Sequence, residues 1–254
     1  MNEWALITGA STGIGYELAR LFAADHFNVV LVARNQARLE TVAGELRAQH
    51  GIQARVLPKD LSSPTAAAEL FEALRDTPIS ILANNAGFGW RGMFAQGELS
   101  RSLEIMHVNM DALVQLTHLF VQPMLARRQG RILNVASTAA FQPGPLTAIY
   151  FASKAFVFSF SVALGEELAG TGVSVTTFCP GGTETEFFGR AGMEGTRNRM
   201  YIMKADKVAR IGYRALMKGK PIAIAGMLNK ISASGARCLP VRLTAKIVRK
   251  LNSG

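Results

Sequence analysis

Residues 4–25, "WALITGASTGIGYELARLFAAD", decide the fold of this chain. The apolar run 4–8 predicts a buried strand, and residues 16–25 carry a helical pattern. Between them lie Gly9, Gly13 and Gly15, in the spacing G-x-x-x-G-x-G. Glycine allows a tight turn, small residues let the backbone approach a pyrophosphate, and a helix start offers free N–H groups and a positive dipole end. The stretch predicts a phosphate-binding loop, with a plain glycine-rich turn as the alternative.

The alternation of strand and helix continues along the chain. Apolar runs predict strands at 28–34, 52–58, 79–85, 130–137 and 172–180, and a short strand at 220–225. Helical patterns occur at 35–50, 64–75, 99–126, 148–169 and 205–217, with a basic helical tail at 236–251. Strands that are apolar throughout indicate a parallel sheet covered on both faces. We therefore predict an α/β fold: a single doubly wound, Rossmann-like domain over 1–254, with a mostly parallel seven-stranded sheet and helices on both faces.

The composition favours a folded domain in a reducing compartment. The 254 residues are 49% hydrophobic and 18% charged, which provides ample apolar material for a core. Cys179 and Cys238 form no spacing motif, so we expect neither a disulfide framework nor a metal site. We find no cleavable signal and no uninterrupted apolar run of about 18 residues. These features predict a cytoplasmic protein, which could also associate with a membrane.

The formal charge of +10 is unevenly distributed. Residues 186–254 hold 15 Lys and Arg against 3 Asp and Glu, whereas residues 1–185 hold 13 against 15. A basic last quarter favours contact with an anionic membrane surface or an acidic substrate, and a solvated basic face is the alternative. We expect no nucleic-acid partner.

The end of the second predicted strand, "VARNQAR" (32–38), indicates the cofactor. An NAD site usually presents Asp or Glu there to the ribose 2′-hydroxyl. This chain has Ala33 followed by Arg34, with Arg38 nearby. A guanidinium group is well shaped for a phosphate, so the stretch predicts NADP(H). A solvent-exposed arginine at a helix start is the alternative.

Seven motifs occur in order: "TGASTGIG" (8–15), "KDLS" (59–62), "NNAG" (84–87), "VN" (108–109), "NVAS" (134–137), "YFASK" (150–154) and "PGGTET" (180–185). With these motifs the chain resembles the short-chain dehydrogenase/reductase family as far as about residue 190. The resemblance implies hydride transfer between NADP(H) and a carbonyl or alcohol carbon. A non-catalytic nucleotide sensor or scaffold protein on the same fold is the alternative, although such proteins typically lose the Tyr or the Lys.

The resemblance implies four catalytic residues: Asn109, Ser137, Tyr150 and Lys154. Tyr150 would be the general acid in reduction and the general base in oxidation. A free phenol titrates near 10, and Lys154, one helical turn further on, would favour the phenolate. Ser137 would hydrogen-bond the substrate oxygen. Asn109 would anchor a water that links Lys154 to bulk solvent.

The resemblance also implies cofactor contacts in the loops that follow the strands. These residues are Gly9, Ser11, Thr12, Gly13, Ile14, Gly15, Arg34, Asp60, Leu61, Asn84, Ala86, Gly87, Tyr150, Lys154, Pro180, Gly181, Thr183 and Thr185. Asp60 would contact the adenine, and residues 186–200 would form a substrate lid.

The residues expected to face the substrate are apolar. They are Phe88, Trp90, Phe94, Phe141, Phe187 and Phe188. An apolar lining with few polar anchors predicts a lipophilic carbonyl or alcohol, although some of these residues could simply be packing in the core. The wording "ANNAGFG" and the basic last quarter resemble a subgroup that includes steroid- and fatty-acyl-type reductases.

Residues 226–254 are predicted to be a basic C-terminal extension. "LPVRLTAKIVRKL" (239–251) interleaves basic residues at helical spacing with Leu243, Ile247, Val248 and Leu251. Such an amphipathic basic helix could lie on an anionic membrane, or pack its apolar side on a neighbouring subunit. The family resemblance implies a homodimer or homotetramer that pairs the helices near 99–126 and 148–169.

Overall fold

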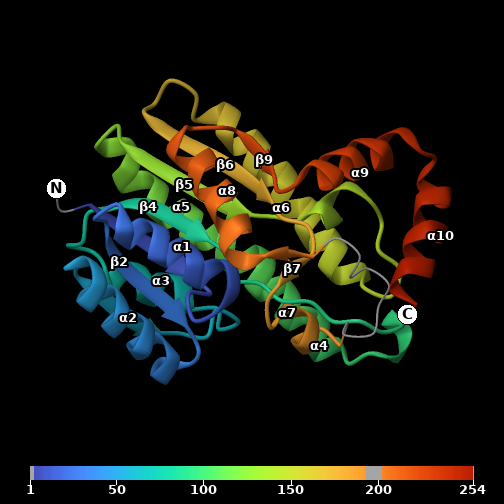
Figure 1. Cartoon of the computed structure of the whole chain (residues 1–254), viewed down its shortest axis with the longest axis horizontal. Helices are drawn as coiled ribbons and strands as arrows, with labels where there is room; N and C mark the ends of the chain where they lie inside the picture. Colours follow the sequence, from blue (N-terminus) through green and yellow to red (C-terminus); the bar gives the residue numbers. More distant parts are fainter. Residues whose placement is uncertain (1–2, 193–201, 254) are drawn as a thin grey trace.

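The computed structural model describes residues 3–192 and 202–253, apart from the side chains of Phe188, Arg190 and Arg237. Its main sheet has the strand order β3-β2-β1-β4-β5-β6-β9, and all the pairings are parallel (Figure 1). The predicted seven-stranded doubly wound sheet is confirmed. Its strands are β1 (Trp4–Thr8), β2 (Asn28–Ala33), β3 (Ala54–Pro58), β4 (Ile79–Asn84), β5 (Gly130–Val135), β6 (Val173–Cys179) and β9 (Ile222–Ile224).

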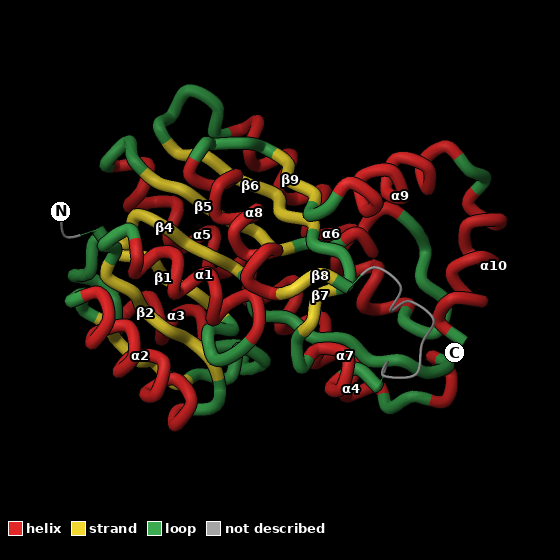
Figure 2. The backbone as a smooth tube through the Cα atoms, viewed as in Figure 1, coloured by secondary structure: helices red, strands yellow, loops and turns green. Residues whose placement is uncertain are grey.

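Helices cover both faces of this sheet (Figure 2). One face carries α1 (Gly13–Ala24), α2 (Gln36–His50) and α8 (Ala205–Met217), and the other carries α3 (Ala66–Ala73), α5 (Ala112–Ala126) and α6 (Ala148–Glu167). Successive side chains of β1 enter the two layers in turn: Ala5 and Ile7 join one core cluster, Trp4 and Leu6 the other. Because both faces of the central strands are buried, strands such as β1 and β4 are buried along their whole length.

The loops after β1 and β4 meet where the strand order reverses, and such a crevice is the usual ligand position in this type of sheet. Gly9 has a left-handed φ of 66°, and a Cβ on Gly15 would overlap the Gly9 carbonyl oxygen. Asn85 donates from Nδ2 to the Thr8 carbonyl oxygen at 2.9 Å, and the Thr8 hydroxyl accepts from the backbone N–H of Ala86 at 2.9 Å. These contacts fix the two loops relative to each other.

The helix predicted over 99–126 is confirmed, and it contains a π-helical turn that the sequence did not indicate. The segment divides into α4 (Leu99–Met106), a π turn (His107–Asp111) and α5. The wider turn buries Asn109, whose Oδ1 accepts from the Phe88 N–H at 3.1 Å and whose Nδ2 donates to the Phe88 carbonyl at 3.0 Å. A helical periodicity in the sequence does not reveal such a widened turn.

The helical tail predicted at 236–251 is confirmed as α10, but its predicted start is wrong, and the helix before it was not predicted. The structure has α9 (Met227–Cys238) and α10 (Val241–Asn252). Pro240 has no N–H with which to continue a helix, and Leu239 before it is extended, with φ −88° and ψ 149°. The glycine and serines of "SASGA" (232–236) are weak helix formers, so the sequence did not predict α9. Both helices stand apart from the sheet, at the end opposite the N-terminus (Figure 1).

Short elements fill the remaining connections. After β6 they include a two-stranded sheet of β7 (Thr183–Glu184) and β8 (Met203–Lys204), and the short helix α7 (Phe187–Arg190). Turns of 3₁₀ helix occur at Phe94–Gln96 and Thr138–Phe141. Within the described residues, α6 alone is long and apolar enough to cross a membrane by length and composition, but it packs on β5 and β6 here.

Candidate active site

A cleft of about 1130 Å³ runs across the carboxyl ends of the strands. Its walls come from the loops after β1, β2, β3, β4, β5 and β6, and from α9 and α10. The volume exceeds the roughly 300–1000 Å³ of a typical small-molecule pocket. The cleft therefore has room for a large ligand, or for two ligands side by side.

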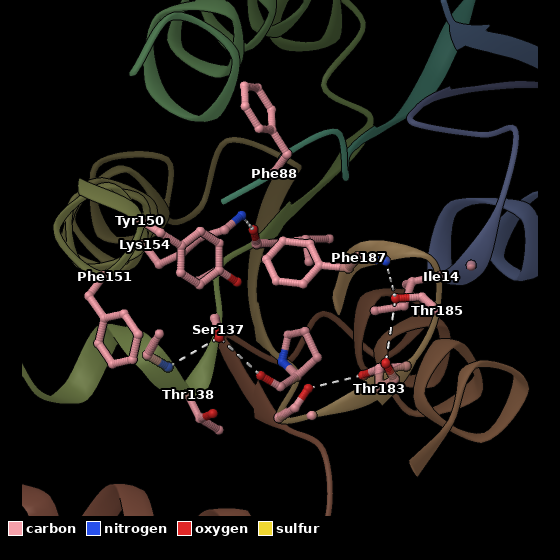
Figure 3. A pocket seen from close by; sticks show the side chains of 18 of the residues that line it. Ile14, Phe88, Ser137, Thr138, Tyr150, Phe151, Lys154, Thr183, Thr185 and Phe187 are labelled. Atoms are coloured by element: carbon pink, nitrogen blue, oxygen red, sulfur yellow. Dashed lines mark hydrogen bonds between the residues drawn. The ribbon is translucent and has the colours of Figure 1, made fainter. Parts of the chain in front are cut away.

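Three polar side chains from two neighbouring elements meet in this cleft (Figure 3). The first two turns of α6 carry Tyr150 and Lys154, and Ser137 follows β5. The Tyr150 hydroxyl points toward Ser137 (Figure 3). Lys154 Nζ lies 5.9 Å from the centre of the Tyr150 ring and donates to the Val135 carbonyl oxygen at 2.8 Å. The strand end and the helix start thus hold a phenol, a hydroxyl and an amine together.

Burial shifts the pKa values of two of these groups in opposite directions. Desolvation raises the pKa of Tyr150 to about 12, and the Ser137 hydroxyl lowers it in part. Desolvation lowers the pKa of Lys154 to about 8, against a smaller opposite effect of Cys179. The phenol therefore keeps its proton near pH 7, while the amine titrates close to neutrality. Such a pair suits general acid–base chemistry.

Asn109 lies behind the cleft and does not line it. Its Nδ2 donates to Ser153 Oγ at 3.0 Å, and Ser153 Oγ donates to the Tyr150 carbonyl at 2.8 Å. A Cβ on Gly87 would lie 3.0 Å from Asn109 Oδ1 and 3.2 Å from Lys154 Nζ, so a glycine there lets both groups approach the loop. Asn109 thus ties the loop after β4 to α6. The water relay through Asn109 stays a prediction.

Most of the residues predicted to contact the cofactor line the cleft. Gly15 does not, because it packs behind Gly9. Asn84 does not either: its Nδ2 donates to Thr117 Oγ1 at 3.0 Å and to Asn134 Oδ1 at 2.9 Å inside the core. The neighbouring Asn85 lines the cleft instead. The predicted residues on the cleft are Gly9, Ser11, Thr12, Gly13, Ile14, Arg34, Asp60, Leu61, Ala86, Gly87, Tyr150, Lys154, Pro180, Gly181, Thr183 and Thr185.

The start of α1 has the features of an anion site. Its N-cap residue, Thr12, makes no side-chain capping bond, and no acidic residue lies in its first turn. Gly13 has a φ of 58°, and a Cβ there would lie 2.7 Å from Thr185 Cγ2. The glycine lets Thr185 approach the start of the helix, whose first N–H groups no capping side chain satisfies. These residues fit the pyrophosphate of a nicotinamide dinucleotide.

The two candidate phosphate-binding arginines are paired with carboxylates. Arg34, on the cleft wall, donates to Glu104 Oε1 at 3.4 Å, and Arg38 donates to Glu186 Oε1 at 2.7 Å. The side chains are 61% exposed for Arg34 and 47% for Arg38. Exposed pairs of this kind contribute little free energy, so a phosphate can replace a carboxylate on either arginine.

The predicted substrate residues divide into two groups. Phe88 and Phe187 line the cleft, and the Phe187 ring lies 5.2 Å from the Tyr150 ring. Trp90, Phe94 and Phe141 do not line it: Trp90 packs over the backbone at Gly92 and Gly97, Phe94 is 60% exposed, and Phe141 packs edge-on against Phe158. The Phe188 side chain and residues 193–200 of the predicted lid lie outside the described residues.

The sequence interpretation missed the apolar wall of the cleft. This wall comes from α9, α10 and the connection between them, through Leu228, Ile231, Leu239, Ile247, Val248 and Leu251. Val248 packs with Ala139 and Phe151, next to Tyr150. The alternation of apolar and basic residues in "VRLTAKIVRKL" marked an amphipathic helix, but not which surface its apolar side covers.

Comparison with known proteins gives one consistent family. The family model described as short chain dehydrogenase matches residues 3–194. Over 183 residues the chain is 37% identical to 17-beta-hydroxysteroid dehydrogenase type 3 of Mus musculus, covering 71% of this chain and 60% of the relative. Over 178 residues it is 35% identical to a very-long-chain 3-oxoacyl-CoA reductase of Laccaria bicolor, covering 68% and 53%. The chain thus spans somewhat more than half the length of these relatives.

One solved structure covers nearly the whole chain. It is a short-chain dehydrogenase from Sphingobium yanoikuyae in complex with NADPH, with a TM-score of 0.85 and 32% identity. The match covers 94% of each chain, and so includes the region beyond residue 194, where the family model ends.

Proposed function

The chain belongs to the short-chain dehydrogenase/reductase family, and from this premise we propose that it is an NADP(H)-dependent oxidoreductase acting on a lipophilic carbonyl or secondary alcohol. One observation carries the proposal. Tyr150, Ser137 and Lys154 come together in the cleft that also contains the uncapped start of α1. A proton donor and an anion site in one cleft are what such a reaction needs from the protein.

The protein's contribution is proton transfer and positioning. A nicotinamide cofactor, when bound, would supply the hydride in reduction and accept it in oxidation. Ser137 holds the substrate oxygen beside the Tyr150 hydroxyl, which gives its proton to a carbonyl oxygen or takes one from an alcohol. The pKa of about 12 keeps Tyr150 protonated at neutral pH, as the reductive direction requires. Lys154, when protonated, lowers the cost of the phenolate that remains.

The glycine loop and Arg34 support the choice of cofactor. The start of α1 would hold the pyrophosphate, and Arg34 at the end of β2 would face the 2′-phosphate. Ala33 occupies the position where an acidic residue would favour NAD. The related Sphingobium yanoikuyae protein, which binds NADPH, agrees with this choice.

The cofactor preference can be measured directly. We expect NADPH to bind more tightly than NADH, and Arg34→Asp to weaken NADPH binding about 10- to 100-fold while leaving NADH binding nearly unchanged. Titration calorimetry with both nucleotides is the measurement. Arg20→Asp, on α1 outside the cleft, makes the same change of charge and is the control. Equal affinities for the two nucleotides in the native chain would refute the preference.

The lipophilic substrate class rests on the apolar cleft wall, which includes Phe88, Phe187 and side chains of α9 and α10. The relatives named for hydroxysteroids and very-long-chain 3-oxoacyl-CoA agree with it. Burial of one methylene contributes about 0.8 kcal/mol, or roughly a fourfold change in affinity.

A turnover screen tests both the reaction and the substrate class. With NADPH, kcat/KM should rise about fourfold per added methylene across a series of ketones, until the cleft is filled. Ketones of equal length with a terminal hydroxyl serve as the matched comparison, and should react more slowly. If kcat/KM did not change with chain length, the apolar pocket would be contradicted, but the proposed reaction would not. No turnover of any carbonyl or alcohol, despite NADPH binding, would instead favour the non-catalytic sensor.

The predicted homodimer or homotetramer and the cytoplasmic location stay predictions. The same holds for a substrate lid at 186–200, of which residues 186–192 are described.

A further inference from the structure

The two consecutive helices α9 and α10, residues 227–252, are joined by two residues and are called the hairpin here. They concentrate the exposed large apolar side chains of the described residues. Among the described residues, 15 large hydrophobic side chains are exposed, and eight of them belong to this hairpin. It makes up about a tenth of the sequence, so the concentration is not what an even distribution would give. The eight are Met227, Leu228, Ile231, Leu239, Val241, Leu243, Ile247 and Leu251.

The hairpin is also purely basic in sequence. Residues 227–252 contain six Lys and Arg and no Asp or Glu. The last acidic residue of the chain is Asp206, in the first turn of α8. The surface is therefore complementary to an anionic partner, and two such hairpins facing each other would bring like charges together.

Three parallel stripes run along α10, each with four-residue spacing. The inner stripe is Thr244, Val248 and Asn252, all buried. Asn252 Nδ2 donates to the Pro145 carbonyl at 3.0 Å and fixes the end of the helix on the body of the protein. The middle stripe, one residue earlier, is Leu243, Ile247 and Leu251, which are 39–46% exposed. The outer stripe, one residue earlier again, is Arg242, Lys246 and Lys250, all exposed.

This order of stripes matches an interfacial helix. Such a helix buries its apolar stripe in the headgroup boundary and places its basic residues among anionic headgroups. Met227, Leu228 and Ile231 of α9 add apolar surface to the same hairpin, with Lys230 beside them. A solvated basic face would not need exposed leucines and isoleucines next to its cations.

The apolar stripe continues into the cleft. Ile247 and Leu251 of α10, and Leu228 and Ile231 of α9, are exposed and also line the cleft that contains Tyr150. A surface that binds lipid at these side chains would bring the mouth of the cleft to the lipid boundary.

We propose that the α9–α10 hairpin docks on an anionic phospholipid bilayer and orients the mouth of the cleft toward it. The docking itself does not depend on the proposed reaction, because it rests on the exposed apolar stripe and its cations alone. Its consequence for the reaction is that a lipophilic substrate reaches Tyr150 from the membrane rather than through water.

Vesicle sedimentation of the full chain tests the proposal without any turnover assay. The vesicles are phosphatidylcholine alone, and phosphatidylcholine with phosphatidylserine. We expect binding to the anionic vesicles only, and a loss on the order of a hundred-fold for the triple variant Arg242→Glu, Lys246→Glu, Lys250→Glu. The matched control is Lys207→Glu, Lys218→Glu, Lys220→Glu, which makes the same change of net charge with exposed residues outside the hairpin. The control should retain most of the binding.

A second variant separates the apolar contribution from the charge. Met227→Ser, Val241→Ser, Leu243→Ser changes exposed side chains that do not line the cleft, and it should also weaken binding. Near-ultraviolet circular dichroism confirms that each variant is folded. Three results would overturn the proposal: no binding of the native chain, equal losses in the two charge variants, or full binding by the apolar variant. A fourth result concerns the oligomeric state without lipid, measured by sedimentation velocity. If the native chain is an oligomer and the apolar variant is a monomer, a second copy of the chain covers the stripe, and the proposal is wrong.

Discussion

Tyr150→Phe is expected to lower kcat by about 10²- to 10⁴-fold, because the variant has no hydroxyl with which to protonate the substrate oxygen. The substitution keeps the ring, so the contact with Phe187 at 5.2 Å and the shape of the cleft should persist. Ser137 keeps its own contacts, because its Oγ accepts from the Ala139 N–H at 3.1 Å and donates to the Pro180 carbonyl at 3.4 Å. The affinity for NADPH should therefore stay nearly the same.

Single-turnover and steady-state assays measure this effect, with NADPH binding measured separately. Tyr16→Phe is the matched control. The Tyr16 hydroxyl does not line the cleft, and it donates to Glu45 Oε2 over a distance of 3.1 Å. That variant should keep native turnover. A Tyr150→Phe variant that retained native kcat would remove Tyr150 from the proposed chemistry. An equal loss of NADPH affinity and kcat would assign it to binding instead.

The strands and the carboxyl-end site were predictable because both follow from local patterns. The central strands of a doubly wound sheet are buried on both faces, so residues such as 29–32 read as one apolar run. The residues that meet in the cleft follow strand ends, as Gly9 and Ser137 do, or start a helix, as Tyr150 does. The order of strands along the chain was therefore enough to bring them to one edge of the sheet.

The features that the sequence did not reveal are decided by tertiary contacts. Asn84 and Asn85 are adjacent and identical in type, but the pleat sends one side chain into the core and the other toward the Gly9 loop. Trp90 and Phe187 are both aromatic residues in loops, and only the packing decides which of them reaches the cleft. The role of α10 in the cleft wall depends on where the break at Pro240 directs the chain.

Lys154→Met is expected to have opposite effects on activity and on stability. Turnover should fall about as much as in Tyr150→Phe, because the cation that stabilises the phenolate is lost. Near pH 7, however, the free energy of unfolding should rise by up to about 2 kcal/mol. The native amine is only 5% exposed, and desolvation lowers its pKa from 10.5 to about 8, so the folded state resists its protonation. A shift of this size corresponds to about 3 kcal/mol below pH 8. Part of that gain is offset because the Val135 carbonyl loses its donor, at about 1–3 kcal/mol.

The sign of this effect changes with pH, which distinguishes it from ordinary repacking. A depressed pKa in the folded state contributes stability that is present above 10.5 and is lost as the pH falls through about 8. The stability of the native chain should therefore rise relative to Lys154→Met between pH 8 and 10.5, and the two curves should cross in that window. Urea unfolding at intervals from pH 7 to 10.5 measures both curves, and Lys218→Met, an exposed lysine, should show no such slope. Parallel curves for the native chain and Lys154→Met would mean that Lys154 is a fully stabilised ammonium in the folded state. Crossing curves would mean that burying Lys154 beside Tyr150 lowers the free energy of unfolding at neutral pH.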